Sequence, residues 1–142
     1  MQGAAKVKVL FIAGVGPIVR DTGESRKLYL DVLGIPFKQE TDGYLHSEAV
    51  PGAKSFALWP LSQAARSCFG KDTWPADIDA PQAWLEFDVD DVASATREME
   101  SRGYRLLVSN RTEPWGQVVS RLLSPEGLLV GLTMTPWMRE KA

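Results

Sequence analysis

Two segments of the chain, 19–37 and 89–107, share one pattern of apolar and polar positions. Each leaves an apolar stretch through an aspartate that can cap a helix, and continues with apolar residues at helical spacing. Each then ends at a glycine placed for a left-handed C-cap. The near-equal spacing of these signals indicates an internal repeat. The caps and terminating glycines are Asp21 and Gly34 in the first segment, and Asp91 and Gly103 in the second.

Strand-like runs follow each helix and complete two similar units. Turn residues separate the runs, which are 35–40, 44–50 and 54–60 in the first half and 104–109, 115–124 and 128–136 in the second. This order predicts an α+β fold of tandem β-α-β-β-β units in one domain, 1–142. Unit 1 covers about 6–63, a linker with one short helix about 64–81, and unit 2 about 82–136. On the helices we expect four buried residues: Leu28, Val32, Val92 and Met99.

Composition and charge exclude several classes of protein. The chain has 142 residues, a net charge of −2 and scattered basic residues, so we expect no basic patch that would bind nucleic acid or an anionic membrane surface. No apolar run reaches the length of a membrane span, and lysines, glycines and a proline interrupt the N-terminal apolar stretch. The single cysteine, Cys68, excludes an internal disulfide, so we expect a cytoplasmic location. Five tryptophans in one small domain indicate either a crowded core or an aromatic pocket.

The repeat, together with the segments "VRDTGESRKLYLDVLGIPF" and "EPWGQ…LLSPEG", resembles the vicinal oxygen chelate superfamily of glyoxalases, bleomycin resistance proteins and extradiol dioxygenases. The resemblance extends from about Val9 to Thr135. It implies two curled mixed sheets that enclose a cleft, with the helices outside. It also implies a homodimer, which is common in that family, and leaves open whether the cleft forms within one chain or across the dimer.

Enzymes of that superfamily usually hold a divalent ion with His and Glu side chains from the first and last strands of each unit. Carrying these places over to this chain gives residues that cannot donate an electron pair to a metal. They are Gly14, Ala57 or Leu58, Trp84 and Gly131. The only histidine, His46, falls on a middle strand. We therefore expect no metal and no other cofactor.

Strand alternation predicts which side chains face the cleft. On the strand 83–89, Trp84 and Glu86 should face it with Asp88 near the rim, while the apolar set packs under the helices. That apolar set is Leu85, Phe87 and Val89. Gly131 on the final strand should face the cleft and leave room there. The candidate ligand-binding residues are Trp84, Glu86, Trp115, Arg121, Gly131, His46 and Trp59.

Structural roles compete with these assignments. Trp59 and Trp137 could instead fill the core, and Glu86 could be neutralised by Arg121 in an ion pair. His46 could be a hydrogen-bonded polar residue without a functional role. A reactive thiol at Cys68 is a further hypothesis.

These residues favour a metal-free protein that binds a small aromatic molecule, in the manner of proteins that sequester a planar cationic antibiotic. Indoles would stack on its rings, and carboxylates would offset its charge. The alternative is a glyoxalase-like lyase or another enzyme of the superfamily whose atypical site uses Glu86, His46 or Arg121. A third hypothesis is an interaction module whose cleft is closed.

Overall fold

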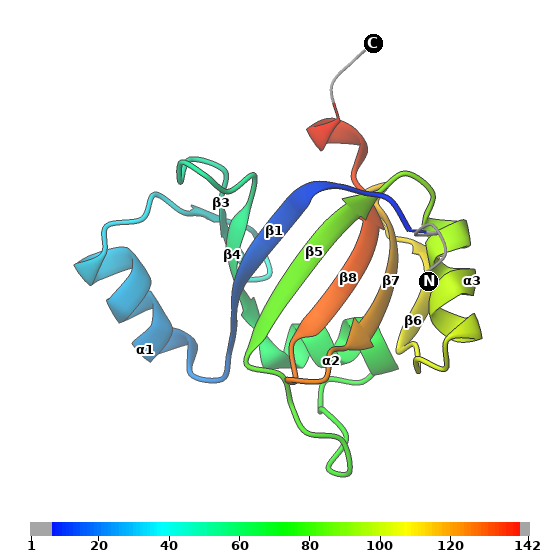
Figure 1. The fold of residues 1–142 in the computed structure, drawn as a ribbon. Helices are drawn as coiled ribbons and strands as arrows, with labels where there is room; N and C mark the ends of the chain where they lie inside the picture. Colours follow the sequence, from blue (N-terminus) through cyan, green and yellow to red (C-terminus); the bar gives the residue numbers. More distant parts are fainter. Residues whose placement is uncertain (1–6, 140–142) are drawn as a thin grey trace.

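The structure, a computed structural model, describes residues 7–139 and contains one eight-stranded mixed sheet (Figure 1). The predicted start of unit 1, at about residue 6, lies outside the described residues. The strands are β1 Val9–Val19, β2 Lys38–Gln39, β3 Leu45–Ser47, β4 Phe56–Pro60, β5 Ala83–Val89, β6 Val108–Thr112, β7 Val118–Leu123 and β8 Leu129–Met134. The helices are α1 Thr22–Arg26, η1 Lys27–Val32, α2 Leu61–Phe69, α3 Val92–Ser101 and η2 Pro136–Met138.

The two halves of the sheet have the same topology, which confirms the predicted α+β fold of tandem units. Strand β1 is parallel to β4, and β4, β3 and β2 continue antiparallel; β5, β8, β7 and β6 repeat this order. Antiparallel pairing of β1 with β5 joins the two four-stranded halves edge to edge. The curled sheets of the two units are therefore halves of one continuous sheet.

The local signals for both helices are confirmed. A side-chain oxygen of Asp21 accepts a hydrogen bond from the Glu24 amide at 3.1 Å, and Asp91 does the same for Ser94 at 3.1 Å. After each helix, the predicted glycine has a positive φ angle, 67° at Gly34 and 86° at Gly103.

The prediction that Leu28 and Val32 are buried is wrong. Their exposed fractions are 48% and 70%, and no residue of α1 or η1 is fully buried. The reason lies in the tertiary packing. The first helix, formed by α1 and η1, lies to the side of the sheet (Figure 1), where Tyr29 packs against Phe56. Its apolar stripe therefore remains open.

Helix α3 packs more closely on its half of the sheet. Val92 is buried, as predicted, in a cluster with Val89 and Leu132. Met99 packs against this cluster but is only half-buried, so the prediction that it is buried is confirmed only in part.

The outer face of the sheet is less covered than predicted. Of the apolar set on β5, Val89 is buried, whereas Leu85 and Phe87 are only half-buried. Ile12 of β1, in register with Phe87, is exposed. Figure 1 shows α1 and α3 at opposite sides of this face, with no helix over the middle strands. The expected packing of β5 under helices was therefore wrong for two of three residues.

Asp88 does not lie near the rim, as predicted, but is fully buried. Its carboxylate accepts hydrogen bonds from the Thr135 amide at 2.9 Å, the Thr133 hydroxyl at 2.5 Å and the Arg139 guanidinium at 3.1 Å. These bonds tie the segment after β8 to the sheet and so place η2 beside the cleft. No helix among residues 7–139 has the length and apolar character to cross a membrane.

Candidate functional site

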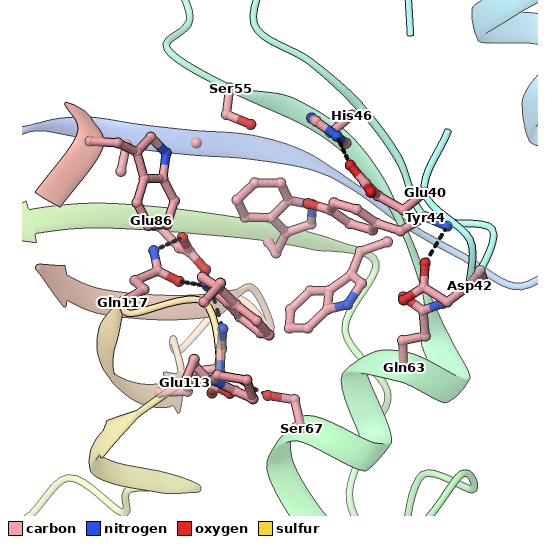
Figure 2. Close-up of a pocket in the computed structure, with 18 of the residues that line it drawn as sticks. Glu40, Asp42, Tyr44, His46, Ser55, Gln63, Ser67, Glu86, Glu113 and Gln117 are labelled. Carbon is pink, nitrogen blue, oxygen red and sulfur yellow. Dashed lines mark hydrogen bonds and ion pairs between the residues drawn. The ribbon is translucent and has the colours of Figure 1, made fainter. Parts of the chain in front are cut away.

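A cavity of about 820 Å³ occupies the cleft face of the sheet and forms within one chain (Figure 2). Side chains from both units line it, and α2 from the linker contributes Gln63, Arg66 and Ser67. The buried face of α2 packs in the same core cluster as Trp84, so this helix covers one end of the cleft. The volume suits a drug-sized molecule.

The floor of the cavity is built around Trp84, whose side chain is only 5% exposed. Its indole N–H donates to the Ala57 carbonyl at 3.2 Å, which satisfies the polar atom of the buried ring. A Cβ atom at Gly14 would lie 2.7 Å from Cη2 of this indole, and one at Gly16 would lie 1.9 Å from the Ala57 oxygen. The two glycines therefore make the space in which the indole lies.

Gly131 does not line the cavity, which corrects the prediction that it leaves open room there. A Cβ atom at this position would lie 2.9 Å from Cγ of Glu86, so the side chain of Glu86 fills the space. The register also corrects the position carried over to β5. Glu86, and not Trp84, lies opposite both Gly14 on β1 and Gly131 on β8.

The residues present do not fit a divalent metal. Glu86 on β5 lies between Gly14 on β1 and Gly131 on β8, so these three paired positions offer a single carboxylate. Within residues 7–139, no group of three or more His, Cys, Asp or Glu side chains could hold an ion.

Glu86 belongs to a buried network centred on Arg121. The Arg121 guanidinium lies 3.4 Å from a carboxylate oxygen of Glu86 and 3.4 Å from one of Glu113, and it donates to the Ser67 hydroxyl at 2.8 Å. Gln117 donates to the other oxygen of Glu86 at 3.1 Å. The ion pair between Glu86 and Arg121, raised as an alternative from the sequence, is thus present. Removing one partner would strand a buried charge.

His46 lies at the other wall of the cavity, between two carboxylates. Its Nε2 is 2.7 Å from Glu40 and its Nδ1 is 2.9 Å from Glu48. Both ring nitrogens therefore lie within hydrogen-bond distance of a carboxylate. The ring also stacks on Tyr44, with centroids 5.6 Å apart. His46 therefore holds the wall that carries Tyr44.

Four of the five tryptophans line the cavity. Trp59 lies edge-on to Trp84, with ring centroids 6.2 Å apart, and Arg121 lies over its ring at 5.1 Å. Trp115 and Trp137 are 56% and 58% exposed, so their indoles are the most exposed of the four. The fifth, Trp74, packs under α2 in the core.

Six of the seven predicted ligand-binding residues therefore meet at one cavity, and their role in binding stays a prediction. Sequence reasoning missed Tyr44, the residues of α2 and four of the lining carboxylates, which are Glu40, Asp42, Glu48 and Glu113. Tyr44, directly before β3, and His46 on it alternate with buried Leu45 and Ser47, which was a usable signal. The α2 residues carried none, because they reach the cavity only through packing of the linker. Cys68 on α2 is buried, and burial raises the pKa of its thiol to about 11, which argues against a reactive cysteine.

Comparisons with known proteins agree with this fold. The model of the Glyoxalase/Bleomycin resistance protein/Dioxygenase superfamily matches residues 12–132. A solved superfamily member from Vibrio splendidus is 15% identical with a TM-score of 0.58, covering 89% of this chain and 99% of that chain. A methylmalonyl-CoA epimerase variant from Streptomyces coelicolor, in complex with 2-nitronate-propionyl-CoA, is 14% identical with a TM-score of 0.55. That match covers 94% of this chain and 100% of the epimerase chain. The comparison with curated proteins found no match. The extent of the family match shows that this chain belongs to the Glyoxalase/Bleomycin resistance protein/Dioxygenase superfamily.

Proposed function

We propose that the protein binds a flat, positively charged aromatic molecule in the cleft, without a metal and without changing it chemically. The observation that carries this proposal is the lining of the cavity, where accessible indoles and an excess of carboxylates meet. Trp115 and Trp137 offer flat apolar surface near solvent, to which an aromatic ring can stack. Such binding would sequester an antibiotic or a similar planar cation.

The preference for a cation comes from the whole lining rather than from Glu86, whose charge Arg121 already balances. Five carboxylates face three guanidinium groups and one imidazole: Glu40, Asp42, Glu48, Glu86 and Glu113 against Arg66, Arg111, Arg121 and His46. Arg66 is also paired with Asp72, which lies outside the lining. Among the described residues, Asp42 forms no ion pair, so it is the carboxylate most available to a ligand.

A matched pair of ligands tests this proposal. N-methylacridinium is permanently charged, whereas acridine has nearly the same shape and is neutral at about pH 8. Calorimetric titration should show binding of the cation at micromolar concentration, roughly tenfold tighter than binding of acridine. Mass spectrometry should recover the compound unchanged. Equal affinity for both would remove the charge preference, absence of binding would remove the proposal, and conversion with turnover would favour an enzyme.

We also propose that the protein is a cytoplasmic homodimer. Six of the exposed large apolar residues lie on β1 and on the first helix: Val9, Leu10, Ile12, Leu28, Val32 and Leu33. Apolar residues exposed at these two places favour burial against another chain, and a second copy would present the same residues about a twofold axis.

A further inference from the structure

Tyr44 is a rigid group on the wall opposite Glu86. Its ring stacks on His46, which two carboxylates hold in place. Its amide donates to the Asp42 side chain at 3.0 Å, and its carbonyl accepts from the Glu40 amide at 2.9 Å. In Figure 2 the Tyr44 side chain extends from this wall into the pocket, with Glu86 on the far side. The phenol therefore has a fixed position before any ligand arrives.

The hydroxyl of Tyr44 makes no hydrogen bond to any residue in the range 7–139, although both backbone groups of Tyr44 are bonded. No buried side-chain polar atom in this range lacks a partner, so the hydroxyl is open to the cavity. Burial, and then the negative charge of Glu86, raise the pKa of Tyr44 well above its ordinary value. The hydroxyl thus remains protonated and able to donate.

Glu86 offers the complementary group across the cavity. Each of its oxygens accepts one hydrogen bond, from Gln117 and from Arg121. A carboxylate has about four lone-pair sites, so both oxygens can accept a further bond from a ligand. The centre of the cavity therefore presents a fixed donor and an acceptor with spare capacity, above an indole floor.

We propose that Tyr44 and Glu86 select a planar heterocycle that carries both a hydrogen-bond acceptor and an N–H donor, such as a lactam or an amino-heterocycle. The acceptor of the ring takes the Tyr44 proton, and the N–H of the ring donates to Glu86. A hydrocarbon ring of the same size would leave the Tyr44 hydroxyl without a partner when it displaced water. This inference rests on the proposed function, because it requires that the cavity binds flat rings.

Three probes of similar shape test the inference: carbostyril, which has both groups, N-methylcarbostyril, which lacks the donor, and naphthalene, which lacks both. The unchanged protein should bind carbostyril most tightly and naphthalene most weakly. Tyr44→Phe should weaken binding of both carbostyrils, each roughly fivefold to tenfold, and should strengthen binding of naphthalene, which then leaves no hydroxyl without a partner. Tyr104→Phe, which removes an exposed hydroxyl outside the cavity, is the matched control.

Equal affinity of the unchanged protein for the three probes would overturn the inference, and so would a folded Tyr44→Phe variant that binds all three as the parent does. Should that variant not fold, the ranking of the three probes by the parent decides alone. If the parent binds N-methylacridinium but does not rank the probes, only this inference fails. If it binds no ring of either set, the proposed function fails with it.

Discussion

The indole of Trp84 occupies the space that a side chain at position 14 would need. A Cβ atom on Gly14 would lie 2.7 Å from this ring, and one on Gly16 would meet the Ala57 oxygen, to which the same indole donates. The two glycines of β1 and the large indole on β5 therefore depend on each other in packing.

We expect Gly14→Ala to destabilise the fold by about 1–3 kcal/mol, because the buried indole must shift. Gly16→Ala should cost more, since the atom it would meet belongs to the backbone of β4. Urea unfolding followed by tryptophan fluorescence measures both. Gly23→Ala is the control, because a Cβ atom there meets only an ordinary contact at 3.5 Å. Equal stability of the Gly16→Ala variant and the parent would contradict the close approach of β1 and β4.

Substitution of the exposed tryptophans should weaken ligand binding, whereas substitution of the buried one should lower stability. Trp115→Ala and Trp137→Ala should weaken binding of N-methylacridinium several-fold, at a cost in stability within about 1 kcal/mol, because both rings are largely exposed. Trp84→Ala should instead lose about 3–5 kcal/mol of stability, since it empties the floor of the cavity. Calorimetry and thermal unfolding of the three variants distinguish these outcomes. Unchanged affinity in both exposed-indole variants would show that the ring binds elsewhere.

Arg121 should matter for stability far more than its exposed counterpart Arg66. Arg121→Ala leaves Glu86 and Glu113 without their shared cation, and we expect a loss of about 3–5 kcal/mol. Arg66→Ala breaks an exposed pair with Asp72 and should change stability by no more than about 1 kcal/mol. Denaturant unfolding compares the two. Similar losses in both variants would mean that the network around Arg121 is not stabilising as inferred.

The stability of the fold should depend on pH in the alkaline range, because the thiol of Cys68 is buried. Burial raises the pKa of Cys68 from an ordinary 9.0 to about 11. Below pH 9 both states keep the proton, and the stability is fully present. Between pH 9 and 11 the unfolded chain loses the proton before the folded chain does, so stability falls as pH rises. The loss should be on the order of 2–3 kcal/mol. The stability of Cys68→Ala should not show this fall between pH 9 and 11, even if the variant is less stable than the parent at every pH. Parallel pH profiles for variant and parent would refute the burial effect.

The dimer proposal predicts a specific interface. Ile12→Lys on β1 and Val32→Lys on the first helix each place a charge among the exposed apolar residues, and should convert a dimer to a monomer in light scattering. Tyr104→Lys changes an exposed aromatic residue on neither element and should leave the mass unchanged. A parent protein that is monomeric at micromolar concentration would remove the proposal.

The sequence by itself determined the features that depend on neighbouring residues. Asp21 and Asp91 cap their helices, and Gly34 and Gly103 end them with a positive φ, because these preferences arise within a few residues of backbone. The recurrence of these signals was enough to predict the repeat, and with it the shared topology of the two halves.

Only the tertiary structure decided what lies against what. Leu28 and Val32 have the spacing of a buried stripe, but their helix stands beside the sheet, so helical periodicity could not predict their exposure. The alternation on β5 correctly turned Glu86 toward the cleft, yet its register with Gly14 and Gly131 depends on pairing between strands far apart in sequence. The same pairing brings Arg121 to Glu86, because residues on β5 and β7 meet only across β8. Side-chain direction is a local property of a strand, whereas register and packing follow from contacts that form only when the whole sheet assembles.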